Sequence, residues 1–280
     1  MSERVPTTEA PRGPVAGPRV TVFSVVTVSF LALFLLMVVA LIVTDVCYTD
    51  FASFAKALGS REVLFAMRLS AVTSLTTLAI IVLFAIPMGY ALSRYRFPGH
   101  VAVDVLVDLP IVLPPIVVGV SLLVFFNTPV GRWSESLGIE FVYSVQGIVL
   151  CQFLVSASFG IRASAAAFDS VDPRLEDLAL TLGCTRAQAF RRVALPMARN
   201  GIVAGAIVAW AHAVGIFGPL MVFAGSTRLK TEVMPTTIYL ELSIGRIETA
   251  LAVAMIMLAA AAAALVIVHA LAPGQRWWSR

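Results

Sequence analysis

Charged residues are scarce in this 280-residue chain: Asp, Glu, Lys and Arg make up 13% of it, whereas apolar residues make up 59%. Soluble globular domains carry about 25% charged residues. The shortage excludes an ordinary soluble enzyme and predicts a protein that crosses the membrane several times. The net charge of +4 does not indicate nucleic-acid binding, because the basic residues lie in short segments between apolar runs, where they orient a membrane protein.

Several kinds of chemistry also lack their sequence patterns. The 3 cysteines are odd in number and lie in separate segments, so we expect no disulfide framework. No G-x-x-x-x-G-K-[ST] phosphate loop occurs, so any ATP would be hydrolysed by a separate subunit. The three histidines lie in different segments, and no C-x-x-C, G-x-S-x-G or HExxH pattern is present. We therefore expect no catalytic residue, no metal site and no cofactor in this chain.

What the chain does contain is a series of long apolar runs, which predict an all-α polytopic membrane protein with six transmembrane helices. The predicted spans cover residues 20–43, 63–92, 101–126, 142–167, 202–224 and 247–272. Residues 1–19 are expected to form a flexible cytoplasmic arm, residues 20–272 the transmembrane domain, and residues 273–280 a cytoplasmic tail. Most of the basic residues lie in the segments assigned to the inside, so both termini are predicted to be cytoplasmic.

One long polar stretch, residues 170–202, interrupts the apolar runs and carries helix signals. Asp172 followed by Pro173 predicts an N-cap and a first-turn proline. Gly183 is expected to end that first helix, and a capping box of Thr185 and Gln188 to open a second one. The Leu195-Pro196 pair is expected to end the second helix. The stretch is therefore predicted to be two short helices joined at a glycine, between two spans.

Helix-breaking residues in two spans form a second candidate site. They indicate a gate in a transport path, or alternatively a kink that lets helices pack. His212, in the middle of a span, is either functional or hydrogen-bonded to a neighbouring helix. The candidate gate and path residues are Pro114, Pro115, His212, Gly215, Phe217, Gly218 and Pro219.

Two further charged segments leave alternatives open. Asp104 and Asp108, one helical turn apart, either pair with Arg94 or Arg96 or simply lie at the water interface. Residues 226–232, in a predicted outer segment, place cations and hydroxyls where a solute would arrive. They either guide an anion or contact a delivery protein, or they form a solvated loop.

The polar stretch resembles the cytoplasmic "EAA" loop of permease subunits of ATP-binding-cassette (ABC) importers. That pattern is an acidic residue, two small residues, a glycine a few positions later, and then an aliphatic-x-Leu-Pro. Asp177-Leu178-Ala179, Gly183 and Val193-Ala194-Leu195-Pro196 occupy these positions, with Leu178 where the family usually has alanine. The segments RYRFPG, PIVLPPIVVG, WAHAVGIFGPLMVFAG and TEVMPTTIYLEL also look like permeases of the molybdate, tungstate and sulfate group.

The resemblance implies a type I (MetI-like) five-helix core in a bacterial or archaeal inner membrane, with two permease copies around a central path. The second copy would be this same chain or a relative. Residues 169–200, here named the coupling loop, would dock into a dimeric cytoplasmic ATPase that holds ATP and Mg²⁺, and an external solute-binding protein would deliver the cargo. The implied ATPase-coupling residues are Leu175, Asp177, Leu178, Ala179, Leu182, Gly183, Phe190, Val193, Leu195 and Pro196.

On a lone subunit, the apolar residues of the coupling loop are expected to leave an exposed surface that needs a partner. They are Leu175, Leu178, Leu182, Phe190 and Val193. The substrate implied by the resemblance is a tetrahedral oxyanion: molybdate, tungstate or sulfate. Related permeases that carry iron(III), thiamine, polyamines, phosphate or sugars remain alternatives.

Two other classes of protein stay open at this point. A stand-alone secondary transporter or channel would need carboxylates deep in the spans or an inverted repeat, and the sequence shows neither. A membrane-embedded enzyme or assembly factor would need a catalytic constellation, which is also missing. Neither class would explain the coupling loop.

Overall fold

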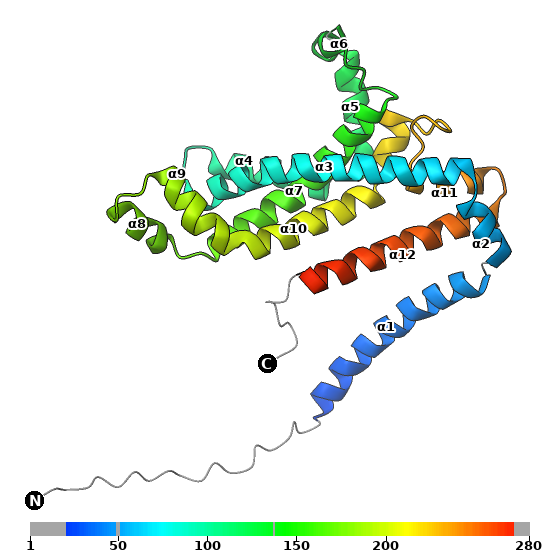
Figure 1. Cartoon of the computed structure of the whole chain (residues 1–280), viewed down its shortest axis with the longest axis horizontal. Coiled ribbons are helices and arrows are strands. Elements are labelled where there is room, and N and C mark those ends of the chain that lie inside the picture. Colours follow the sequence, from blue (N-terminus) through cyan, green and yellow to red (C-terminus); the bar gives the residue numbers. More distant parts are fainter. Residues whose placement is uncertain (1–20, 49–50, 137, 272–280) are drawn as a thin grey trace, which may run out of the picture. The chain divides into compact units, whose positions relative to one another are not determined.

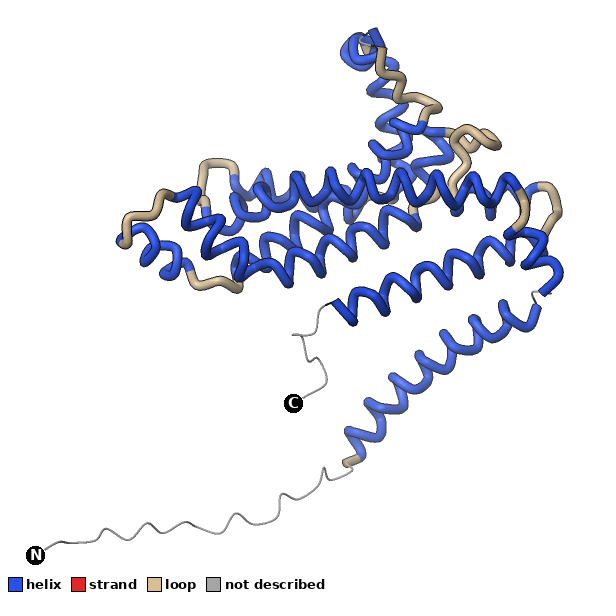
Figure 2. Tube along the Cα trace, viewed as in Figure 1, coloured by secondary structure: helices blue, strands red, loops and turns tan. Residues whose placement is uncertain are grey.

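The computed structural model describes residues 21–48, 51–136 and 138–271, and within these ranges it contains helices and loops but no strand (Figure 2). The chain divides into two compact units, residues 1–48 and 49–280. The predicted arm (1–19) and tail (273–280) lie outside the described residues. The all-α prediction is confirmed.

The first unit contains one described helix, α1 (Val22–Tyr48), with 27 residues and no buried side chain. At 1.5 Å per residue it is about 40 Å long, which is enough to cross a bilayer. Its mean hydropathy is 3.0 in the most apolar window, and its side chains are apolar on every face. Such a helix suits lipid on all sides.

The core of the second unit is α7 (Val145–Asp169), which packs against α3 (Arg61–Arg94) and α10 (Leu195–Gly215) (Figure 1). Hydroxyl and amide side chains join these helices: Thr77 of α3 donates to Gln152 of α7 at 3.0 Å, and the Trp210 indole of α10 donates to Ser74 of α3 at 3.2 Å. Small residues permit the close approach; a Cβ on Gly205 would lie 2.1 Å from Ala163 Cβ. Thr77 and Ser74 of α3 thus help to hold the three helices together.

The third predicted span is broken into α4 (His100–Val112) and α5 (Pro115–Asn127), and the chain bends by 110° between them. Pro114 is the N-cap of α5 and Pro115 its first residue. Neither proline can donate a backbone hydrogen bond, so the helix stops and restarts. The predicted interruption is confirmed, while Pro110 is accommodated inside α4.

The predicted helix end at Leu195-Pro196 is wrong. Four-residue α9 (Arg186–Ala189) runs through the π-helix η1 (Phe190–Ala194) into α10, giving one helix of 30 residues from Arg186 to Gly215. Pro196 is in the first turn of α10. The missing donor of a proline is tolerated there because the wider π turn just before it changes the hydrogen-bond pattern. The coupling loop is therefore rigidly continuous with a membrane helix.

Five shorter or later elements complete the second unit. They are α2 (Phe51–Leu58), α6 (Pro129–Ser136), η2 (Leu220–Ala224), α11 (Met234–Ser243) and α12 (Ile247–Leu271). Helix α11 packs on α12 and α3, and α12 also packs on α2.

The number of spans remains a prediction. Among the described residues, four helices are long and apolar enough to cross a membrane by length and composition: α1, α3, α7 and the helix from Arg186 to Gly215. The bent pair α4 and α5 makes a fifth if it forms one span, and α12 has a shorter apolar part, Ile247–Ala263.

Candidate functional site

The coupling loop begins with α8 (Pro173–Thr181), whose predicted start is confirmed. Asp172 accepts a hydrogen bond from the Arg174 backbone N–H at 3.0 Å. The helix stops before Gly183, whose φ of +89° suits glycine because side chains disfavour this left-handed conformation. Thr185 and Gln188 then form the predicted capping box, with bonds of 2.8 and 3.3 Å. Helix caps and one glycine thus shape a turn between α8 and α9.

An exposed apolar edge follows from this shape. Leu182 is 85% exposed, Leu178 57% and Leu175 36%. Asp177 and Gly183 beside them are also exposed. A Cβ on Gly183 would meet no atom within 4 Å, so the turn is open to a partner. Three of the five apolar positions expected to be exposed are confirmed.

Phe190 and Val193, also expected to be exposed, are half-buried, so that part of the prediction is wrong. The Phe190 ring lies 4.7 Å from that of Tyr90 and 6.0 Å from that of Phe168. Leu195 packs in the same apolar cluster, and Ala179 of α8 is also buried. Phe190 and Leu195 thus face the ends of α3 and α7, where they seat the loop.

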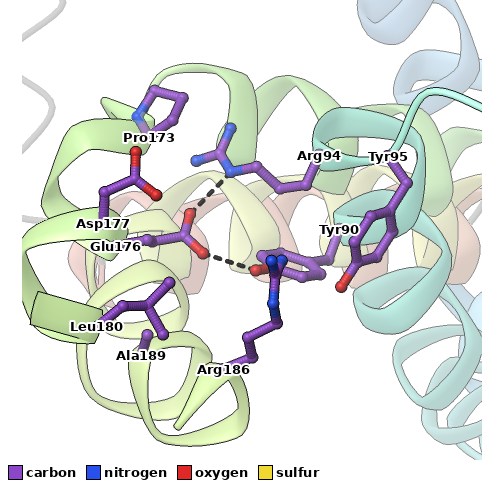
Figure 3. A pocket seen from close by; sticks show the side chains of 9 residues that line it. All are labelled: Tyr90, Arg94, Tyr95, Pro173, Glu176, Asp177, Leu180, Arg186 and Ala189. Carbon is purple, nitrogen blue, oxygen red and sulfur yellow. Dashed lines mark hydrogen bonds and ion pairs between the residues drawn. The ribbon is translucent and has the colours of Figure 1, made fainter. Parts of the chain in front are cut away.

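Glu176 fastens α8 to the end of α3 (Figure 3). Its carboxylate accepts a hydrogen bond from the Tyr90 hydroxyl at 2.6 Å and from Arg94 Nε at 2.7 Å. Arg94 also donates to the Val171 carbonyl at 2.8 Å. Sequence reasoning missed this contact. No local signal could have revealed it, since its partners are more than 80 positions away in the chain.

These three side chains border a cavity of about 200 Å³ that α8 and α3 form together (Figure 3). Asp177 and Arg186 also line it. The exposed surface of the coupling loop is strongly basic, because five of its arginines are exposed. They are Arg174, Arg186, Arg191, Arg192 and Arg199.

The candidate gate lies where α10 ends. Gly215 is the last residue of α10, and Gly218 and Pro219 lead into η2. A Cβ on Gly119 of α5 would lie 2.7 Å from the Pro219 Cα, so the two broken helices touch backbone to backbone. Phe217 stacks on Tyr239 of α11 at 5.4 Å. The structure thus brings Pro114, Pro115 and the 215–219 segment into one region, and their role as a gate stays a prediction.

His212 of α10 contacts two side chains of α7. Its Nδ1 lies 3.2 Å from the Ser156 hydroxyl. Its ring centre is 4.6 Å from the ring centre of Phe159. These contacts fit the alternative of a histidine bonded to a neighbouring helix.

Asp104 and Asp108 pair with Arg162 of α7, and not with Arg94 or Arg96. Arg162 NH1 lies 2.8 Å from Asp104, and its NH2 donates to Asp108 at 2.8 Å. His100 Nδ1 lies 2.9 Å from Asp104. The alternative of two carboxylates at the water interface is compatible with this pairing, because the Asp104 and Asp108 side chains are still 31% and 47% exposed. One arginine thus clamps two carboxylates and ties α4 to α7.

The outer segment is solvated only in part: residues 227–230 are exposed, whereas Thr231 and Glu232 are buried. Arg228 donates to Glu241 of α11 at 2.6 Å, and this hydrogen bond raises the pKa of Arg228. Glu232 is completely buried, which raises the pKa of its carboxyl group. Its two carboxylate oxygens have no hydrogen-bond partner. Within the described residues, no group of three or more His, Cys, Asp or Glu could hold a metal ion.

Comparison with known proteins shows where this architecture belongs. The family model for the "binding-protein-dependent transport system inner membrane component" matches residues 81–277. The molybdate/tungstate transport system permease protein WtpB of Thermococcus kodakarensis is 40% identical over 176 residues, covering 63% of this chain and 67% of that protein. The sulfate transport system permease protein CysT of Escherichia coli K12 is 29% identical over 244 residues, covering 86% and 88%.

Solved structures share the fold at low identity. A bacterial ABC transporter that imports the acidic polysaccharide alginate has a TM-score of 0.67 at 20% identity, covering 92% of this chain and 96% of that one. The MetNI methionine ABC transporter has a TM-score of 0.62 at 18% identity, covering 76% and 95%. The type I importer core expected from the sequence is thus confirmed. The chain belongs to the family of binding-protein-dependent transport system inner membrane components, and it is an ABC importer permease and not an enzyme.

Proposed function

We propose that this permease carries a tetrahedral oxyanion, namely molybdate, tungstate or sulfate, across the cell membrane. The observation that supports this substrate class is the similarity to permeases named for these anions, at 40% and 29% identity. The structural neighbours named for alginate and methionine are 20% identical or less, so they support the fold alone. Iron(III), thiamine, polyamine and phosphate are the substrates that the test must exclude.

The coupling loop is the proposed contact with a separate ATPase dimer, which would hold ATP and Mg²⁺. The observation that carries this proposal is the exposed edge of Leu178 and Leu182 on a loop that continues without interruption into α10. An exposed apolar edge at the end of a membrane protein suits a protein partner. Because a helix is stiff, movement of the docked loop would be passed along α10 toward the break at 215–219, as alternating access requires.

The first test is purification in mild detergent, with identification of the bound proteins. We expect an ATPase with a phosphate-loop motif to co-purify. Because we propose a homodimer, we also expect two differently tagged copies of this chain to co-purify. Co-purification of a related permease instead of the second tagged copy would indicate a heterodimer. An intact, folded chain that retains no ATPase, or that takes up solute without ATP, would support a secondary transporter instead.

The substrate test uses proteoliposomes with the ATPase and the cognate solute-binding protein. We expect ATP-dependent uptake of molybdate, tungstate or sulfate, each added alone, and no uptake of phosphate, iron(III), thiamine or a polyamine. Uptake of one of these other solutes, with none of the three oxyanions, would overturn the oxyanion proposal and leave the permease role standing.

Gly183 offers a sharp test of the coupling role. Gly183→Asp and Gly183→Asn place side chains of the same shape in the same open space, and Asn and Asp both tolerate positive φ. Only Asp adds a negative charge to the apolar edge. We expect ATPase co-purification and ATP-driven uptake to fall at least about tenfold in Gly183→Asp, and much less in Gly183→Asn. Equal loss in both variants would point to backbone strain, and no loss in either would contradict docking at this turn.

A further inference from the structure

The contact of Glu176 with Tyr90 and Arg94 joins two parts of the protein that the chain keeps far apart. Glu176 belongs to α8, in the exposed coupling loop, and the other two belong to the last turns of α3. The side chains of Arg94 and Glu176 are only 11% and 10% exposed. Both oxygens of the Glu176 carboxylate accept a hydrogen bond, one from the Tyr90 hydroxyl and one from the Arg94 guanidinium. We name this group of three residues the α3 clasp.

The α3 clasp has the properties of a strong and specific contact. Hydrogen bonds to a charged group are worth about 1.5–3 kcal/mol each, and breaking a buried ion pair by removing one partner costs more than replacing both. Arg94 also holds the Val171 carbonyl, just before α8 begins. The Tyr90 ring packs against Phe190, just after α9. The end of α3 therefore holds the coupling loop at its entrance, in its first helix and near its exit.

Helix α3 leads from the clasp to the far end of the unit. It has 34 residues and packs along α7 and α10. At its other end, the Ser70 hydroxyl accepts a hydrogen bond from the Met234 backbone N–H of α11 at 2.8 Å. Val63 and Ala66 pack in a cluster with Met234 and with Val253 of α12. A displacement of the loop that moved α3 would thus reach α11, on the side where solute is expected to enter.

We propose that Glu176 is a positioning residue that makes α3 a second route of coupling, parallel to α10. The route through α10 is covalent, and the route through α3 exists only while the α3 clasp is closed. This inference rests on the proposed function, because it assigns a role within ATP-driven transport. Loss of the clasp leaves the docking edge of Leu178 and Leu182 in place, so ATPase binding persists while uptake per ATP falls.

The first experiment needs no ATPase and measures amide hydrogen exchange in the purified chain. In Glu176→Gln, we expect the amides of α8 to exchange about tenfold faster than in the wild type, which corresponds to about 1.4 kcal/mol, while those of α7 are unchanged. Arg94→Gln should act in the same way. In the variant that carries both Glu176→Gln and Arg94→Gln, the α8 amides should exchange no faster than in Arg94→Gln alone, since no unpaired charge remains. Arg96→Gln, an exposed arginine two positions on, is the matched control and should match the wild type.

The second experiment measures uptake per ATP hydrolysed in proteoliposomes with the ATPase and the solute-binding protein. Glu176→Gln should lower this ratio about tenfold while the amount of bound ATPase stays the same. Tyr90→Phe keeps the ring against Phe190 and removes only the hydroxyl, so it should lower the ratio severalfold. A purely structural role would lower the amount of folded complex and leave the ratio unchanged.

Each outcome decides the proposal. Wild-type ratios in both Glu176→Gln and Tyr90→Phe overturn it, even if α8 exchanges faster. If Glu176→Gln does not fold, Tyr90→Phe and Arg94→Lys decide by the same ratio. If the wild-type chain binds no ATPase, the proposed function fails and this inference falls with it. If the wild type transports and the ratios do not change, the α3 route alone fails.

Discussion

Glu232 is a buried carboxyl group for which the structure provides no hydrogen-bond partner. Within the described residues, the buried side-chain oxygens that lack a hydrogen-bond partner are Ser226 Oγ, both carboxylate oxygens of Glu232, and Oε2 of Glu241. All three residues lie between η2 and the end of α11. Burying a polar group without a partner usually costs about 1–3 kcal/mol. The segment is therefore less stable than its burial alone would suggest.

The raised pKa of Glu232 predicts a pH dependence. Above a pH of about 4.5, the ordinary pKa of this group, an unfolded chain would lose the Glu232 proton while the folded chain keeps it. Stability therefore falls as pH rises from there through the raised folded pKa, and stays lower above it. In Glu232→Gln we expect this pH-dependent loss of stability to disappear, because an amide does not ionise.

Thermal unfolding in detergent between about pH 4.5 and 8 checks this prediction. The difference between Glu232→Gln and wild type should grow with pH. Glu140→Gln, at an exposed position, is the control substitution of the same kind. A difference for Glu232→Gln that is largest at acid pH would show that the carboxylate has a partner when ionised.

At the scale of elements, the contact between α5 and the break after α10 is the closest approach in the candidate gate. A Cβ on Gly119 would lie 2.7 Å from Pro219 Cα and 2.8 Å from its carbonyl oxygen. Both neighbours are backbone atoms, which cannot move aside as a flexible side chain does. Gly119→Ala must therefore shift α5 or the 215–219 segment, and overpacking of this kind costs about 1–3 kcal/mol.

We expect Gly119→Ala to lower transport at least severalfold while the coupling loop still binds the ATPase. Uptake and ATPase co-purification measure the two effects separately. In Gly59→Ala the added methyl group would have only ordinary contacts, at 3.6 Å or more, so this control should transport normally. Normal transport by Gly119→Ala would mean that the two broken helices can separate without consequence.

At the scale of the whole molecule, the three cysteines report on orientation. Cys47 at the end of α1 is exposed, Cys184 beside Gly183 is half-buried, and Cys151 is buried in α7. If the coupling loop is cytoplasmic, a membrane-impermeant maleimide should label Cys47 on intact cells and Cys184 only after the membrane is opened. Cys151 should not react on either side.

The variants Cys47→Ser and Cys184→Ser assign each label to its residue. Added ATPase should also slow the labelling of Cys184 without affecting Cys47, because the docking edge surrounds Gly183. Labelling of Cys184 on intact cells would contradict the predicted orientation of both termini.

Local chemistry explains which predictions succeeded. Asp172 before Pro173, the glycine at 183 and the Thr185–Gln188 box act within one turn of the chain, so the start, joint and second helix of the coupling loop were readable from their spacing. The same holds for the break at Pro114 and Pro115. The predicted stop at Pro196 failed because a preceding π turn can absorb a proline, and no local signal marked that turn.

By itself, the sequence determined the all-helical membrane fold, the place of the coupling loop and the family, because apolar length and turn chemistry act locally. Only the tertiary structure decided which polar side chains meet. It pairs Asp104 and Asp108 with Arg162, bonds His212 to Ser156, turns Phe190 inward and closes the α3 clasp on Glu176. Such contacts depend on how helices distant in the chain pack, and residue spacing along the chain does not encode that geometry.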